Sequence, residues 1–144
     1  MSRQTLYNRW PTTADILLEA PLTRASRTIG IGERTDLRSY LAELAAAVDG
    51  WARPALRALA VFSQSDPKFA GRFHDEFLAV RHGALTAAVR ASSPDPARSD
   101  LDAELIAASL WYRVLIVDAD LDDRWVDDMT GLVSGRRTPK GGGR

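Results

Sequence analysis

The sequence predicts an all-α protein, and three observations support that prediction. Apolar residues recur three and four positions apart along most of the chain, which is the spacing of one helix face. No segment shows the sustained alternation of apolar and polar residues that is typical of a half-buried strand. Residues that begin and end helices, such as Asp66 followed by Pro67, separate these stretches. We therefore expect packed helices and no sheet.

Length and composition indicate one globular domain. The chain has 144 residues, of which 45% are hydrophobic and 26% charged, with a net charge of zero and no cysteine. A chain of this length buries about 68% of its unfolded surface. The lack of cysteine excludes disulfides and thiolate chemistry, and no apolar run approaches the ~20 residues that span a membrane. The N-terminus also lacks the apolar core of a secretory signal, so we expect a cytoplasmic protein with no membrane partner.

Two short helices and a connector are predicted at the N-terminus. Ser2 caps a helix that ends at Pro11, because proline cannot continue a helix interior. Thr12 and Asp15 have the spacing of a capping box at the start of the next helix. The polar, glycine-containing stretch 23–34 shows little periodicity and is interpreted as a connector or a frayed helix end.

Start and stop signals divide the middle of the chain into further helices. Asp36 caps one helix, and Gly50 with Pro54 predicts a break before another, so that the two are antiparallel or kinked neighbours. Asp66 and Pro67 begin a run that extends to about Ala91. The apolar faces of these helices comprise Leu37, Leu41, Leu44 and Val48, then Leu56, Leu59 and Phe62, then the ridge Phe69, Phe73 and Phe77.

The helix that follows the loop Ser92–Pro96 is apolar on almost every side. Ser99 or Asp100 caps it, and it runs to about Val117. Its two opposed faces are Leu101, Leu105, Tyr112 and Ile116, and Ile106, Leu110, Val114 and Val117. Such a helix must be covered from both sides, and a second copy of the chain can provide that cover.

A last helix, capped by Asp120 and ended by Gly135, carries another broad apolar stripe. We expect it to form a four-helix bundle with the preceding helix and the same two helices of a partner subunit. The residues predicted at this dimer interface are Leu105, Leu110, Val114, Val117, Trp125, Met129 and Leu132.

Catalytic and metal-binding signals are weak. His74 and His82 lie on one helix about 80° out of register and lack the glutamates of a carboxylate-bridged metal site. Asp118, Asp120 and Asp122 copy the start of a calcium loop, but the required glycine and final glutamate are missing. We therefore expect neither an enzyme nor a metal or other cofactor.

Two features allow alternative interpretations. Arg113 lies in an apolar run, where it either forms a salt bridge, extends its head group to water or contacts a ligand. Several aromatic residues either fill the core or line a small-molecule cavity between helices. These residues are Trp51, Phe62, Phe73, Phe77, Trp111 and Tyr112.

The N-terminal stretch SRQTLYNRWPTTADILLEA, from Ser2, resembles the recognition helix and the start of the next helix in TetR-family transcriptional regulators. The family's helix-turn-helix ends in threonine, a hydrophobic residue, tyrosine, two variable residues and an aromatic residue, here Thr5 to Trp10. In the C-terminal half, FHDEFLAVRHGAL, DLDAEL and LWYRVLIVDADLDDRWVDDMTGLV resemble the ligand-sensing and dimerisation region of a TetR subgroup.

The resemblance implies which N-terminal side chains contact DNA. By position, Arg3, Gln4, Thr5 and Asn8 face the major groove, while Tyr7 and Thr13 approach phosphates. The family usually has lysine where Thr13 stands, so one cationic phosphate contact is weakened. The pattern also begins inside the motif, without the two helices that the family places before it. We therefore expect either a chain whose start lies upstream of Met1 or a truncated regulator.

Together these observations predict three segments: a partial DNA-binding helix-turn-helix over 1–20, a helical ligand-binding and dimerisation domain over 21–134, and a disordered basic tail over 135–144. The leading hypothesis is a homodimeric TetR-like repressor whose DNA binding is modulated by a small-molecule effector. The alternative is a truncated, DNA-binding-incompetent module that dimerises and senses a ligand.

Overall fold

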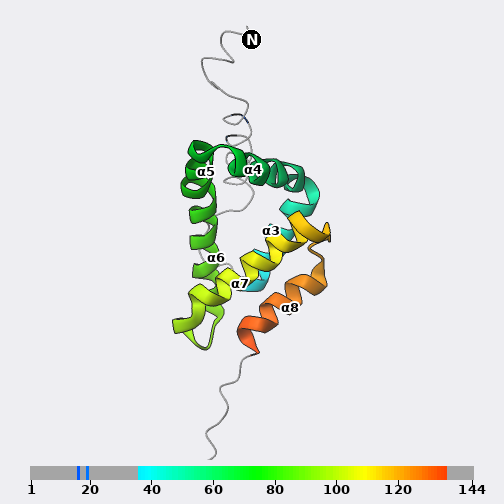
Figure 1. Ribbon diagram of the computed structural model, residues 1–144. Coiled ribbons are helices and arrows are strands. Elements are labelled where there is room, and N and C mark those ends of the chain that lie inside the picture. Colours follow the sequence, from blue (N-terminus) through cyan, green and yellow to red (C-terminus); the bar gives the residue numbers. More distant parts are fainter. Residues whose placement is uncertain (1–15, 17–18, 20–35, 136–144) are drawn as a thin grey trace, which may run out of the picture.

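The computed structural model describes residues 36–135 together with Ile16 and Glu19, and this part of the chain contains helices and no strand (Figure 1). The all-α prediction is therefore confirmed for the described residues. In chain order the elements are α3 (Leu37–Ala47), η1 (Val48–Ala52), α4 (Arg53–Ser65), α5 (Pro67–Phe73), η2 (His74–Leu78), α6 (Ala79–Ser92), η3 (Pro96–Arg98), α7 (Ser99–Tyr112), η4 (Arg113–Val117) and α8 (Asp123–Ser134). The segments η1, η2 and η4 are π-helical, and η3 is a short 3₁₀ turn.

The helices enclose a core that all of the longer elements share. In Figure 1, α5 and α6 run down one side, α4 lies across their upper end, and α7 crosses the body diagonally. The chain then turns back along α8, which packs beside α3, α6 and α7. The side chains of Leu41, Leu59, Ile106, Val114 and Trp125 are almost completely buried at the centre of this arrangement.

The first described helix begins where the sequence predicts. The Ser39 backbone N–H donates to Asp36 Oδ1 at 3.0 Å, which confirms Asp36 as the cap of α3. The predicted break at Gly50 and Pro54 is wrong, because the π-helical η1 connects α3 to α4 directly. Pro54 lies in the first turn of α4, a position that tolerates proline. Of the two predicted arrangements, α3 and α4 have the kinked one.

The second cap prediction is confirmed, and the run that follows it ends at Ser92. Asp66 Oδ1 accepts the backbone N–H groups of Lys68 and Phe69 at 2.9 and 3.2 Å. Phe69, Phe73 and Phe77 are buried and form the predicted ridge, with ring centroids 6.2 and 5.5 Å apart. Gly83 lies inside α6, where a Cβ built on its backbone would meet no atom of another element within 4 Å.

The caps predicted for the last two helices differ from those in the structure. The chain enters α7 through the η3 turn, so neither Ser99 nor Asp100 provides a side-chain cap. The first turn of α8 is capped by Asp122, whose Oδ1 accepts the Trp125 N–H at 2.9 Å, and not by Asp120.

Contacts with η1 and α4 explain why α8 begins later than predicted. Arg53 donates to the Ala119 carbonyl at 2.9 Å, and Asp49 accepts the Leu121 N–H at 2.6 Å. Arg57 donates to the Val114 carbonyl at 2.8 Å and pairs with Asp118 at 2.6 Å. These contacts hold the connection between α7 and α8 in a non-helical path, in which Asp118 has a left-handed φ of 51°.

Membrane insertion has no support in the described residues, where no helix is both long and apolar enough to cross a bilayer.

Candidate ligand cavity

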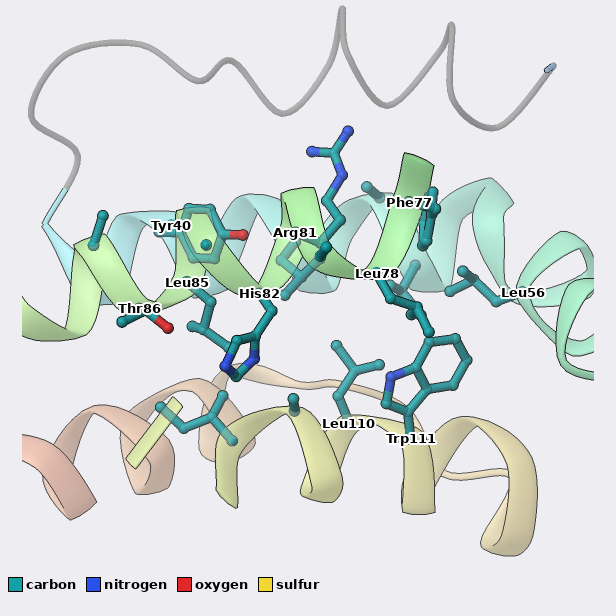
Figure 2. A pocket seen from close by; sticks show the side chains of 18 of the residues that line it. Tyr40, Leu56, Phe77, Leu78, Arg81, His82, Leu85, Thr86, Leu110 and Trp111 are labelled. Atoms are coloured by element: carbon teal, nitrogen blue, oxygen red, sulfur yellow. The ribbon is translucent and has the colours of Figure 1, made fainter. Parts of the chain in front are cut away.

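A large cavity lies between α3, η1, η2, α6 and α7, with a smaller contribution from α4 (Figure 2). Its volume of about 760 Å³ falls within the range of small-molecule sites. The wall is mostly apolar. Its apolar lining includes Leu44, Ala47, Val48, Trp51, Ala52, Leu56, Phe77, Leu78, Ala79, Leu85, Ala87, Ile106, Ala107, Leu110 and Trp111. Its other lining residues are Tyr40, His74, Arg81, His82, Gly83, Thr86, Arg90 and Asp100.

Half of the predicted pocket aromatics line this cavity. Trp51, Phe77 and Trp111 are on its wall, whereas Phe62, Phe73 and Tyr112 are not. Phe73 is buried next to the wall, with its ring 6.4 Å from that of Trp111 in an edge-to-face contact. Phe62 packs edge-on against Phe69, with the two ring centroids 6.0 Å apart, and the Tyr112 side chain is 56% exposed. The structure therefore brings aromatic rings from η1, η2 and α7 together at one cavity.

The polar side chains of the cavity are gathered toward one end. Figure 2 shows Tyr40, His82 and Thr86 there beside Leu85, and Leu56 and Trp111 toward the other end. A ligand that fills the whole space would therefore be amphipathic, with its apolar part against the aromatic rings.

Arg81 is the most unusual residue of the wall. Its Nη1 atom is buried and has no hydrogen-bond partner. The guanidinium carbon lies 5.9 Å from the centre of the Phe77 ring, a cation–π contact that does not supply an acceptor for Nη1. Burial lowers the pKa of Arg81, since it disfavours the charged form, and the nearby Tyr40 hydroxyl opposes that shift.

Tyr40 and Thr86 add two more buried polar groups. Burial raises the pKa of the Tyr40 hydroxyl above 10.0, and the positive charge of Arg81 acts in the opposite direction. In Figure 2 the Tyr40 oxygen points toward Arg81. The Thr86 Oγ1 atom is buried without a partner. These buried polar groups remain available for a ligand.

Two other basic side chains of the cavity have acidic partners, and the third, His82, is exposed. Arg90 pairs with Asp100 at 3.7 Å, and His74 Nδ1 lies 2.8 Å from an Asp75 carboxylate oxygen. Within the described part of the chain, no three His, Asp or Glu side chains group closely enough to hold a metal ion.

The sequence interpretation missed Tyr40, Arg81 and Thr86 because helical spacing alone does not show which polar side chains become buried beside a cavity. A signal for Arg81 was present, since it lies four residues after Phe77 and therefore on the same helix face as the phenylalanine ridge.

Comparison with known protein families matches residues 33–133, more than half of the chain, to the family described as tetracyclin repressor-like, C-terminal domain. The chain belongs to this family. The resemblance to TetR-family regulators is thereby confirmed for the C-terminal domain. The comparisons found no match among curated proteins and none among solved structures.

In this TetR-like domain, α7 and η4 present one face to the core and the other to solvent. Of the predicted face Ile106, Leu110, Val114 and Val117, the first three are buried and Val117 is 46% exposed. The opposite face is exposed, and we name it the α7 stripe. It consists of Leu101 (46% exposed), Leu105 (41%), Tyr112 (56%) and Ile116 (71%).

The residues predicted at the dimer interface divide between these surfaces. Leu105 and Val117 are exposed, and Met129 and Leu132 are half-buried. Leu110, Val114 and Trp125 lie instead inside the subunit, because α7 and α8 pack against the rest of the domain. Trp125 Nε1 also donates to Ser109 Oγ at 3.0 Å within the same chain. A partner subunit can therefore reach the α7 stripe but not these three side chains.

Arg113, for which several roles were open, donates to the Asp120 carbonyl at 2.6 Å.

The side chains predicted to contact DNA all lie outside the described residues. They are Arg3, Gln4, Thr5, Tyr7, Asn8 and Thr13.

Proposed function

We propose that the chain is a TetR-like transcriptional repressor whose DNA binding is modulated by a small molecule in the cavity between α3, η1, α6 and α7. The observation that carries the proposal is the cavity itself, which has about 760 Å³ of mainly apolar space inside a tetracyclin repressor-like C-terminal domain. Small-molecule sites are mostly apolar clefts or cavities of about 300 to 1,000 Å³, so a cavity of this size and lining favours a ligand-binding role.

The DNA-reading part of the proposal comes from the N-terminal sequence. Arg3 can donate to guanine, and Gln4 or Asn8 can pair with adenine in the major groove. Thr5 belongs to the same reading surface, while Tyr7 and Thr13 would contact phosphates and set the register.

The exposed α7 stripe supports a homodimer. Leu105, Tyr112 and Ile116 lie on one side of α7 and η4, where a twofold axis would bring them against the same side chains of a second copy. Leu115 and Val117, which are also exposed, extend this apolar surface along η4. Burying it would remove solvent-exposed apolar area, which is the main favourable term in subunit association.

One helix links the two sites. Ile106, Leu110 and Trp111 line the cavity, while Leu105 and Tyr112 on the same turns face the proposed partner. A ligand that binds one position of α7 better than another would shift the population of dimers with different spacings between their DNA readers. Operator half-sites lie about 34 to 36 Å apart, so a change in this spacing would weaken DNA binding.

The experiment that tests the regulator proposal is an electrophoretic mobility shift with DNA that flanks the gene, repeated over a series of salt concentrations. The gene product, including any coding sequence upstream of Met1, should bind this DNA more tightly than unrelated DNA of the same length at every salt concentration. Arg3→Ala should reduce this preference, whereas Arg124→Ala, on the exposed surface of α8, should not. Equal affinity for flanking and unrelated DNA would contradict the proposal.

The second candidate is a ligand-sensing, dimerising module that does not bind DNA. The family match is to the C-terminal domain alone, 33–133, which contains both the cavity and the α7 stripe. A mobility shift with the 144-residue chain itself distinguishes the two candidates, because sequence-specific binding by this chain would exclude the second.

A further inference from the structure

We propose that the ligand of this cavity is an amphipathic organic monoanion, a carboxylate with an apolar body, and that Arg81 binds the carboxylate. This inference rests on the proposed function, since it specifies the chemistry of the same site.

The charges around the cavity favour an anion. Arg81 is a cation of the wall that forms no ion pair with any described residue, whereas Arg90 is paired with Asp100. A buried guanidinium nitrogen without an acceptor costs free energy, and a ligand carboxylate would supply that acceptor. The planar guanidinium also matches the two oxygens of a carboxylate better than it matches a single hydroxyl.

The number of unpaired cations limits the charge of the ligand. Arg81 can neutralise one negative charge; among the other basic side chains of the described wall, His74 and Arg90 have acidic partners, and His82 is an exposed imidazole. A phosphate dianion would therefore retain an uncompensated charge inside a mainly apolar space, at a large cost in desolvation. A monocarboxylate avoids this cost.

The rest of the wall favours an apolar body. Trp51, Phe77 and Trp111 provide aromatic surfaces, and Leu56 with Leu78 extends the apolar end in Figure 2. Burial of an alkyl or aryl body against these side chains would supply most of the affinity. The Arg81 contact would then select the acid over an alcohol or amine with the same body.

The test uses the full chain and three probes with the same alkyl body: decanoate, 1-decanol and decyltrimethylammonium. Binding is followed by tryptophan fluorescence, because Trp51 and Trp111 are on the wall. Decanoate should bind saturably and about tenfold more tightly than 1-decanol, as expected for one hydrogen-bonded charge pair. Decyltrimethylammonium should bind more weakly than either.

Substitutions of Arg81 test whether this residue causes the preference for decanoate over 1-decanol. Arg81→Met keeps the apolar stem without the charge and should weaken decanoate binding about tenfold while leaving 1-decanol binding unchanged. Arg81→Lys should restore part of the decanoate affinity. Arg124→Met, which removes an 87% exposed arginine side chain on α8, is the matched control and should bind all three probes like the unmodified chain.

The outcomes separate this inference from the proposed function. Equal binding of decanoate and 1-decanol to the unmodified chain would overturn the anion preference but leave the cavity as a ligand site. Saturable binding of none of the three probes would contradict the ligand-binding function as well. The comparison of probes needs no variant, so it remains decisive if Arg81→Met fails to fold.

Discussion

Asp66 is the clearest single-residue determinant of a helix start in this protein. Its carboxylate accepts two backbone N–H groups of the first turn of α5, which have no partner within the helix. Asp66→Ala should therefore lower the free energy of unfolding by about 1 kcal/mol, measured by urea denaturation. Gln64→Ala, at an exposed position of α4, is the control and should change it by less than about 0.5 kcal/mol. An equal effect of the two substitutions would contradict the capping role.

Tyr40 should make the stability of the domain sensitive to alkaline pH. Because burial raises the pKa of this phenol in the folded state above 10.0, the folded chain retains its proton at pH values where the unfolded chain loses it. The free energy of unfolding should thus fall as pH rises above 10.0, and this fall should be smaller in Tyr40→Phe. Urea denaturation below and above that pH measures the effect, with Tyr112→Phe as the exposed control. Identical pH dependence in Tyr40→Phe and the unmodified chain would contradict it.

Residue-level signals were predictable where their partners are neighbours in sequence. Asp36 and Asp66 cap helices by bonding to backbone groups three residues away or fewer, so the local pattern is sufficient. The cap of α8 was misassigned to Asp120 because the path before this helix depends on Asp49, which bonds to Leu121 from a distant part of the chain. No local pattern contains that contact.

At the scale of elements, the N-terminal part of α4 anchors the connection between α7 and α8. Arg57→Met should lose the hydrogen bond to the Val114 carbonyl and the ion pair with Asp118 while keeping much of the apolar stem. We expect the free energy of unfolding to fall by about 1 kcal/mol, because the Arg57 side chain is partly exposed and solvent screens its charge. Urea denaturation measures the change. Lys68→Met, on the exposed side of α5, is the control and should change the free energy of unfolding little. If Arg57→Met also leaves the free energy of unfolding unchanged, the contacts of Arg57 do not stabilise this connection.

Helix positions were predicted better than helix geometry. The spacing of Phe69, Phe73 and Phe77 was enough to predict a continuous run to the end of α6. The π-helical segment η2 inside this run was not predicted, because it preserves the apolar face that periodicity detects. The same limit applies at η1, where Gly50 and Pro54 indicated a break but the chain continues as a helix.

At the scale of the whole molecule, the sequence predicted a cavity lined by aromatic residues but not the polar residues of its wall. Aromatic residues were expected at a cavity between helices, and Trp51, Phe77 and Trp111 are there. The polar group that defines the ligand chemistry in our proposal, Arg81, was missed. Its significance depends on which charges lie beside it after folding, and this is a property of tertiary structure.

In our proposal, α7 connects the ligand cavity to an interface between two copies of the chain. The oligomeric state shows whether the α7 stripe forms that interface. Sedimentation velocity at micromolar concentration should find a dimer for the unmodified chain and a folded monomer for Ile116→Glu, which places a charge in the α7 stripe. Val61→Glu is the matched control: Val61 is 70% exposed on α4, compared with 71% for Ile116, and its replacement should leave the dimer intact. A folded monomer for the unmodified chain, or a dimer that persists in Ile116→Glu, would contradict the account.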